Sequence, residues 1–328
     1  MAAFTHRTVM SDEIVSALLS GPCEPRWLVD ATAGGGGHGE ALLRAAPSAS
    51  LLAVDRDPRA LDAVRSRLSP WAGRVRLVPG RFGDLLLHLE REAFGERDPD
   101  GAWCVDGMVL DAGVSSPQLD EPERGFSFQR PGPLDMRMGE DGETLGEYLE
   151  SVDEGELARI LREYGEVKSS RRLARAILDE MAAGALQDTG DLARVCERIL
   201  RRPGPPPRIH PATLPFQALR IAVNDELGEL ERFLHVAPGA LRPGGRLAII
   251  SFHSLEDRLV KRAFRSLSRP APIPRGLPVR EVDRPVYFDE VGKLLRPSEH
   301  ECELNPRARS ARLRVLERRS RNGEVAHA

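Results

Sequence analysis

The feature that most constrains the fold of this 328-residue chain is a series of short apolar segments, three of which end in an aspartate. The second of them leads into a stretch with helical apolar spacing, where Asp57 and Pro58 occupy the first positions of the helix. Four segments within the first 111 residues are predicted strands, at 26–30, 51–55, 75–78 and 108–111. Strands that alternate with helices predict parallel βαβ units and an α/β fold.

The alternation stops between about residue 119 and residue 215, where the predicted elements are helices at 156–164, 171–181 and 192–200. It then resumes with one long apolar helical face over 219–234, a fifth strand at 246–252, a helix at 255–267 and a last strand at 311–317. We therefore predict a discontinuous α/β domain formed by residues 1–120 and 216–328. An all-helical domain, residues 121–215, is inserted into it.

A glycine-rich loop follows the first predicted strand and permits two interpretations. Gly34, Gly36 and Gly39 satisfy the G-x-G-x-x-G pattern of dinucleotide sites, and Asp55 at the next strand tip suits a ribose. Asp30, directly before the loop, would however face the pyrophosphate of a dinucleotide, where like charge is unfavourable. S-adenosylmethionine has no phosphate and carries an ammonium and a sulfonium. The carboxylate therefore favours S-adenosylmethionine over NAD, although Asp30 as a simple backbone acceptor stays open.

The loop after the fourth predicted strand, residues 111–118, contains an acid, two hydroxyls, a proline and an amide. Ligands of open α/β sheets lie beyond the carboxyl ends of the strands, so this loop is a candidate for holding a substrate amine. The Ser116-Pro117 pair is equally typical of a turn, and both interpretations stay open.

The composition, 41% hydrophobic and 30% charged, is that of a globular protein. No apolar stretch approaches the roughly 18–20 residues of a membrane-spanning helix, so we expect no membrane association and a cytoplasmic location. The four cysteines are isolated and the histidines show no HxH or HExxH spacing, so we expect no metal site. Because the net charge is −3, any nucleic-acid binding must come from local basic patches.

Six longer motifs cover much of the chain: LDAGVSSPQLD at 110–120, RGFSF at 124–128, GPLDMRM at 132–138, FQALRIAVNDEL at 216–227, GGRLAIISFHSLEDRLVKR at 244–262 and NPRARSARLR at 305–314. They resemble the MraW/RsmH family of bacterial methyltransferases. The resemblance implies a class I, Rossmann-like fold that uses S-adenosylmethionine, with the inserted helical domain recognising the substrate. It also implies methyl transfer to the N4 amine of a cytidine in 16S ribosomal RNA of the small ribosomal subunit.

The resemblance places cofactor contacts at Gly36, Gly37, His38, Asp55, Phe82, Asp111 and Gln118. By the residues alone, His38 is a helix cap or a solvent contact, and Phe82 is equally well a core residue. The chain departs from the family pattern at Leu214-Pro215, where the family usually has an arginine. Amino-methyltransferases also often carry an aromatic residue after the Ser-Pro pair, and candidates to replace it are Phe126, Phe128 and Phe252.

An exocyclic cytosine amine is a poor nucleophile that no side chain can usefully deprotonate beforehand. Catalysis is therefore expected from in-line placement of nitrogen, methyl carbon and sulfur, with acceptors that orient the N–H groups and no single general base. The candidate acceptors are Ser115, Ser116, Asp135 and His253. Of these, His253 follows the fifth predicted strand and hence lies at the same sheet edge.

Local basic clusters predict RNA contacts at Lys168, Arg171, Arg172, Arg175, Arg201 and Arg202, and a further cluster lies within 307–314. Arginine suits phosphate, although each cluster is nearly as well explained as a solvated helix face. Two alternative functions stay open, a DNA amino-methyltransferase and a non-catalytic ribosome-assembly factor that binds RNA. An oxidoreductase ranks lowest. The oligomeric state is also open, with a homodimer as one alternative.

Overall fold

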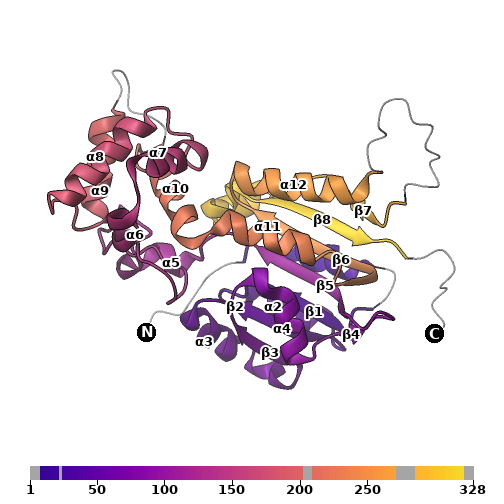
Figure 1. Cartoon of the computed structure of the whole chain (residues 1–328). Coiled ribbons are helices and arrows are strands. Elements are labelled where there is room, and N and C mark those ends of the chain that lie inside the picture. Colours follow the sequence, from indigo (N-terminus) through magenta and orange to yellow (C-terminus); the bar gives the residue numbers. More distant parts are fainter. Residues whose placement is uncertain (1–7, 22–23, 202–208, 271–284, 321–328) are drawn as a thin grey trace, which may run out of the picture. The chain divides into compact units, whose positions relative to one another are not determined.

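The computed structural model describes residues 8–21, 24–201, 209–270 and 285–320, which form two compact units (Figure 1). The first unit contains residues 1–113 and 228–328, and the second contains residues 114–227. The predicted boundaries, after residues 120 and 215, differ from these. The helix that follows Pro215 belongs to the second unit because Phe216, Ala218 and Leu219 are buried in its apolar core.

The first unit is built on an eight-stranded sheet. Its strands are β1 (Trp27–Asp30), β2 (Ser50–Asp55), β3 (Val75–Pro79), β4 (Glu96–Arg97), β5 (Trp103–Asp111), β6 (Leu241–Ser251), β7 (Phe288–Glu290) and β8 (Arg312–Arg318). They are ordered β3-β2-β1-β5-β6-β8-β7, with β4 paired to β5 outside this path. The neighbours from β3 to β6 are parallel, whereas β8 and β7 add antiparallel pairs at one edge. The predicted α/β class with a parallel central sheet is confirmed.

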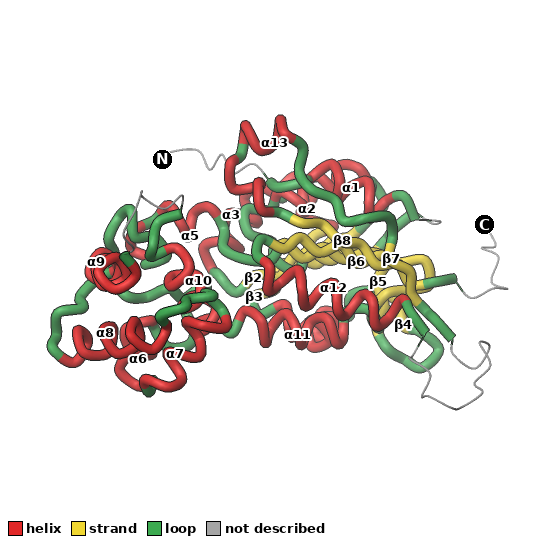
Figure 2. Tube along the Cα trace, turned by 90° about the horizontal axis from the view of Figure 1, so that it is seen from above, coloured by secondary structure: helices red, strands yellow, loops and turns green. Residues whose placement is uncertain are grey.

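Helices cover both faces of this sheet (Figure 2). They are α1 (Ser11–Leu19), α2 (Gly37–Ala45), α3 (Pro58–Arg67), α4 (Leu85–Glu92), α11 (Glu226–Val236), α12 (Ser254–Ser268) and α13 (Glu299–Leu304), with 3-10 turns η1 (Ser69–Arg74), η2 (Phe82–Asp84) and η5 (Pro306–Ser310). Along β1, Leu28 packs in the core shared with α1, α2 and α3, and Val29 packs in the core shared with α4, α11 and α12. Strands buried on both faces are apolar along their whole length, which is why they could be predicted.

The second unit is helical in its described part, apart from one isolated bridge between Pro133 and Asp188. Its elements are α5 (Ser116–Asp120), the 3-10 turn η3 (Pro122–Arg124), α6 (Leu145–Ser151), α7 (Glu154–Glu163), α8 (Ser170–Ala182), α9 (Thr189–Leu200) and α10 (Thr213–Asn224). Leu157, Leu173 and Leu192 of three successive helices are fully buried in one core. In the parts of both units that the structure describes, no helix is long and apolar enough to cross a membrane.

The single helix predicted over residues 219–234 is in fact two helices. α10 ends at Asn224, Asp225 adopts a left-handed φ of 51°, and α11 begins at Glu226. The buried Asn224 side chain fixes this end, since its Oδ1 accepts from the Met138 N–H at 2.8 Å and its Nδ2 donates to the Met136 carbonyl at 2.7 Å. Apolar spacing continues through the break, so periodicity alone could not reveal it.

Candidate active site

Three aspartates end neighbouring strands at one edge of the sheet. In the parallel register, Asp30 of β1 lies opposite Ala53 of β2 and Val109 of β5. The ends of β2 and β5, which carry Asp55 and Asp111, therefore lie on either side of it. This is the carboxyl edge, where open α/β sheets bind their ligands.

The glycine loop is tied to the ends of both flanking strands. The Gly34 N–H donates to Asp55 Oδ2 at 2.7 Å, and the Asp111 N–H donates to the Thr32 hydroxyl at 2.7 Å. Burial raises the pKa of the Asp55 carboxyl, an effect that its bonds to backbone N–H groups oppose. Thr32 was not among the site residues predicted from the sequence. A hydroxyl between a strand end and a glycine loop is the signal that would have found it.

Two loop positions require glycine for geometric reasons. Gly36 has a left-handed φ of 76° directly before α2. A side chain on Gly37 would overlap the hydroxyl of Thr8. A loop without side chains would let a ligand approach the backbone closely, and the cofactor contacts expected at both glycines stay a prediction.

Asp30 is a buried carboxylate whose hydrogen bonding is incomplete. Only 1% of its surface is exposed, and Oδ1 accepts a single hydrogen bond, from the Thr32 N–H at 3.3 Å. Oδ2 has no partner among the described residues. Burial raises the pKa of this carboxyl to about 6, against the opposing effect of His38. Because a buried unpartnered carboxylate is costly, Asp30 indicates a place for a cationic group.

His38, in the first turn of α2, is buried beside the aspartates. Its Nε2 lies 3.4 Å from Asp111 Oδ2, and neither ring nitrogen forms an aligned hydrogen bond within the described ranges. Burial alone lowers the pKa of the imidazole, but the carboxylates of Asp111, Asp30 and Glu301 outweigh it and raise that pKa. The ring does not cap α2, so His38 is a member of a buried charged group.

Phe82 follows β3 and is partly buried. Its ring packs edge to face on Phe233 of α11, with centroids 5.7 Å apart. Phe82 is therefore in part a core residue, which is one of the two roles considered for it from the sequence. Its remaining surface lies beyond the carboxyl end of β3, which pairs with Asp55 at Pro79.

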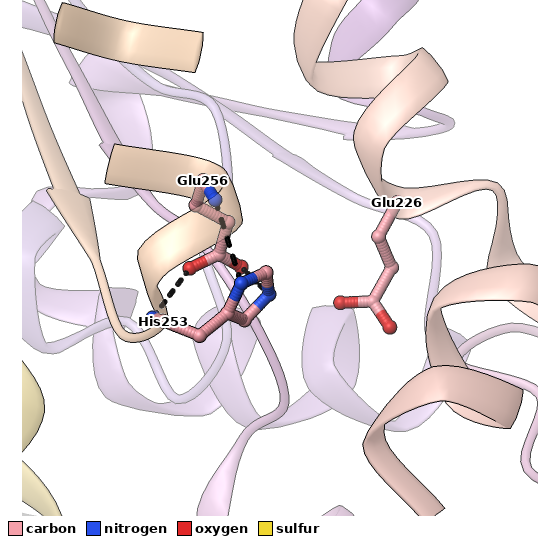
Figure 3. Close-up of side chains that lie close together, drawn as sticks. All are labelled: Glu226, His253 and Glu256. Atoms are coloured by element: carbon pink, nitrogen blue, oxygen red, sulfur yellow. Dashed lines mark hydrogen bonds and ion pairs between the residues drawn. The ribbon is translucent and has the colours of Figure 1, made fainter. Parts of the chain in front are cut away.

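His253 follows β6 at the same edge and begins α12 (Figure 3). Its Nδ1 accepts from the Glu256 N–H at 3.4 Å, and its Nε2 lies 3.0 Å from Glu256 Oε1. Glu256 Oε2 in turn accepts from the Phe252 N–H at 2.7 Å. Glu256 was not predicted, although a capping residue followed three positions later by glutamate is a helix-start pattern. Glu226, also drawn, belongs to the other unit, where it binds Arg220 at 2.8 and 2.9 Å.

Ser115 and Gln118, in the helical unit, are joined at the start of α5. The Ser115 N–H donates to Gln118 Oε1 at 3.0 Å, and Gln118 Nε2 donates to the Met138 carbonyl at 3.1 Å. Gln118 is buried and therefore shapes the loop that carries the serines. The side chain of Ser116 lies outside the described part.

Asp135 is paired with a neighbouring guanidinium. Its Oδ1 and Oδ2 accept from Arg137 Nε and Nη2 at 2.8 and 2.9 Å. Burial alone raises the pKa of Asp135, but Arg137 outweighs it and holds that pKa below its ordinary value. Asp135 is thus an ionised carboxylate with one cation already bound.

Among the predicted aromatic substitutes, Phe126 is buried in the helical core. Phe128 stacks on His210 with centroids 4.5 Å apart. Phe252, just after β6, is partly exposed and packs beside Gly113. Phe252 therefore lies at the carboxyl edge of the sheet in the first unit, whereas Phe126 and Phe128 belong to the second unit.

The predicted RNA-binding residues fall into two groups. Arg175 forms two hydrogen bonds with Glu154, both of 3.1 Å, and Arg172 donates to a backbone carbonyl. Arg202 lies outside the described residues. Lys168, Arg171 and Arg201 are exposed, and their side chains have neither an ion pair nor a hydrogen bond to any described residue.

A model of the MraW methylase family matches residues 3–319. The chain belongs to this family. A ribosomal RNA small subunit methyltransferase H from Anaeromyxobacter dehalogenans is 50% identical over 318 residues, 97% of this chain and 99% of the relative. A protein of the same name from Methylobacterium nodulans is 48% identical over 315 residues, 95% and 90% of the two chains. An rRNA methylase structure from Streptococcus thermophilus covers 97% of this chain and 100% of its own, at 14% identity and a TM-score of 0.38, too low to support an argument.

As a member of this family the chain uses S-adenosylmethionine, and the residues at the carboxyl edge fit that cofactor. Asp30 Oδ2, both ring nitrogens of His38 and Asp111 Oδ1 are buried polar atoms without hydrogen-bond partners in the described ranges. The carboxylate oxygens of Asp30 and Asp111 are acceptors that suit a ligand that carries an ammonium and a sulfonium, whereas the His38 ring carries at least one N–H donor. A pyrophosphate would instead add negative charge beside Asp30, Asp55 and Asp111.

Proposed function

We propose that this chain transfers a methyl group from S-adenosylmethionine to the N4 amine of a cytidine in 16S rRNA of the small ribosomal subunit, in the cytoplasm. The observation that carries the proposal is the buried group of Asp30, His38 and Asp111 beside the glycine loop, with polar atoms left for a cationic ligand. The names of the relatives support small-subunit rRNA as the substrate. The hydroxyls of the Ser-Ser-Pro loop support an amine as the acceptor.

Each predicted cofactor residue has a role in this proposal. When bound, S-adenosylmethionine supplies an electrophilic methyl group on its sulfonium. Asp30 binds the cationic methionine end, Asp55 the ribose hydroxyls and Phe82 the adenine. The remaining contacts come from Gly36, Gly37, His38, Asp111 and Gln118.

The target amine is oriented by hydrogen-bond acceptors, and the candidates are not equivalent. Both ring nitrogens of His253 already face Glu256, and Asp135 already binds Arg137. A serine hydroxyl both donates and accepts, so Ser115 and Ser116 are the first candidates to hold the N–H groups. Asp135 and His253 then act mainly by fixing the loops around them, and Phe252 supplies a ring for the base to stack on.

RNA binding in the helical unit is assigned first to the exposed basic residues whose side chains have neither an ion pair nor a hydrogen bond. Lys168, Arg171 and Arg201 meet this criterion within the described residues, and Arg202 remains part of the predicted set. Arg172 and Arg175 must exchange a protein partner for phosphate, so we expect smaller effects from their removal. A phosphate contact weakens strongly with salt.

The experiment that tests this function uses tritiated S-adenosylmethionine and small ribosomal subunits from cells that lack the enzyme. After incubation, the RNA is digested and the labelled nucleoside is identified. We expect N4-methylated cytidine. Asp30→Ala is expected to bind no cofactor and give no label, whereas Ser115→Ala is expected to bind the cofactor normally and to methylate slowly.

Three outcomes would contradict the proposal. Label in another nucleoside would show a different acceptor atom. Binding of S-adenosylmethionine without label in the subunits would show a different substrate. RNA binding without any cofactor binding would favour the non-catalytic assembly factor.

A further inference from the structure

The long helix after β6 has an unusual charge distribution. From Arg258 to Arg269 the chain contains five basic residues and no acidic one. Four of these residues are exposed, namely Arg258, Arg262, Arg265 and Arg269, and the fifth, Lys261, is partly exposed. None of the predicted RNA-binding clusters includes this segment.

The exposed arginines form one row along α12. The spacing of four and three residues places Arg258, Arg262 and Arg265 on a single helical face that runs for about 10 Å, and Arg269 directly follows the last residue of α12. The opposite face is anchored, because Val260 and Phe264 are buried in the core of the first unit. α12 lies on the side of the sheet opposite to α1 and α2 (Figure 2). The row is therefore held on a rigid element.

Protein carboxylates do not neutralise this row, whereas they do neutralise several other arginines of the unit. Asp257 binds Arg312 Nη1 at 3.0 Å and Arg314 Nε at 2.8 Å, so two arginines of the predicted C-terminal cluster serve to join α12 to β8. Arg319 is likewise bound by Asp289. The four basic residues of α12 and Arg269, which follows it, have by contrast no ion pair with any residue that the structure describes.

We propose that this row of α12 binds the phosphate backbone of the substrate RNA, an inference that rests on the proposed function. Guanidinium groups form forked hydrogen bonds with phosphate, and their charge is best used where no protein carboxylate competes. The row starts five residues after His253, which follows the carboxyl end of β6. It therefore begins near the cofactor edge of the same unit and leads away from it, as a track for RNA that flanks the target nucleotide.

An anionic membrane is the other polyanion that such a row would attract. A helix that binds at a membrane surface buries its apolar face in the lipid. The apolar face of α12 is already used by the core, with Phe264 fully buried. RNA, which needs only the charged face, therefore fits the observations better.

The test compares two triple variants that remove the same charge. One carries Arg258→Gln, Arg262→Gln and Arg265→Gln. The control carries Arg65→Gln, Arg76→Gln and Arg91→Gln, which are exposed residues of α3, β3 and α4. For each protein, Kd for a fragment of unmethylated 16S rRNA is measured over a range of salt, together with Kd for S-adenosylmethionine and methylation of small subunits.

We expect the α12 variant to bind the RNA about tenfold more weakly at low salt and to lose about two to three units of the slope of log Kd against log salt. Its KM for subunits should rise, while kcat and Kd for S-adenosylmethionine stay unchanged. The control should match the wild type. Equal RNA affinity and equal salt slope in all three proteins would overturn the inference. The inference would also be overturned if the α12 variant lost binding to phosphatidylserine vesicles but bound RNA as the wild type does.

This design separates the inference from the function on which it rests. RNA affinity and its salt slope are measured without turnover, so the row is tested even if the labelled nucleoside is not N4-methylcytidine. An α12 variant that binds RNA normally but methylates slowly would overturn the inference that the row binds RNA and would leave the proposed function intact.

Discussion

Replacement of Asp30 by asparagine should stabilise the ligand-free protein near neutral pH and weaken cofactor binding at the same time. Asp30 is 1% exposed, accepts one hydrogen bond and lies near the like charges of Asp111 and Asp55. Burial is the largest cause of the raised pKa, and it outweighs the opposing effects of His38 and of the hydrogen bond from the Thr32 N–H. An amide of nearly the same shape has no charge to bury, so it removes the cost of an ionised carboxylate.

The size of the effect follows from the pKa. The pKa of Asp30 is raised from 3.8 to about 6. One unit corresponds to about 1.4 kcal/mol, so the ionised carboxylate costs the folded protein about 3 kcal/mol above this pKa. His38 loses a favourable partner in the variant, and we therefore expect a net gain of about 2 kcal/mol in the free energy of unfolding.

The direction with pH follows from counting protons. Between pH 3.8 and about 6 the folded protein holds more protons at Asp30 than the unfolded chain does. The contribution of Asp30 to stability therefore falls as pH rises through this window and is constant above it. The advantage of Asp30→Asn should accordingly be small at the acidic end of the window and complete at neutral pH.

Urea unfolding of the wild type and Asp30→Asn, at about pH 4.5 and about pH 7.5, measures this difference. Asp57→Asn is the matched control, because Asp57 caps α3 through the Arg59 N–H at 3.1 Å and asparagine caps equally well. Saturating S-adenosylmethionine should raise the Tm of the wild type and of the control, but hardly that of Asp30→Asn. A variant that is less stable than wild type at both pH values, or a difference that does not change with pH, would refute the reasoning.

Three further substitutions or probes test other parts of the structure. Gly37→Ala should abolish cofactor binding in a titration and lower the free energy of unfolding by about 1–3 kcal/mol, because its methyl group overlaps the side chain of Thr8. Gly73→Ala, whose methyl group lies in open space, should change neither cofactor binding nor stability. Asp257→Asn should lower the free energy of unfolding, measured in urea, by about 2 kcal/mol because two guanidiniums lose their carboxylate. Asp289→Asn removes the carboxylate of an exposed ion pair and should lower it by less than about 1 kcal/mol. Burial raises the pKa of the Cys196 thiol to about 12, so iodoacetamide should label it only after unfolding, as mass spectrometry would show.

β1, β2 and the C-terminal parts of β5 and β6 could be predicted because they are unbroken apolar runs, as strands buried on both faces must be. β8 could be predicted from its alternation of apolar and basic residues. β4 and β7, of two and three residues, are too short to give such a signal. The break at Asp225 was missed for a different reason. Nothing in the local sequence shows that the Asn224 side chain will bind the backbone of Met136 and Met138.

The roles of charged residues could be predicted only in part, because their partners lie far away in the sequence. Arg175 and Lys168 look alike as members of one basic cluster, but Arg175 is bound by Glu154 and Lys168 is exposed. The basic run in α12 was passed over, and its lack of carboxylate partners appears only in the folded chain. Sequence finds where charge accumulates, and the fold decides which charges remain available for a ligand.

Two aspartates of the first unit show how this distinction identifies the site. Asp257 is 9% exposed, and although burial alone raises its pKa, Arg314 and Arg312 lower it below the ordinary value. Asp30 is more deeply buried, and its pKa is raised by that burial because no protein cation binds Oδ2 in the described part of the chain. A carboxylate satisfied by arginines stabilises the fold, whereas one left without a cation reduces its stability until a ligand arrives. We therefore expect the unpaired carboxylate beside the glycine loop to be the part of the sheet edge that binds the cofactor.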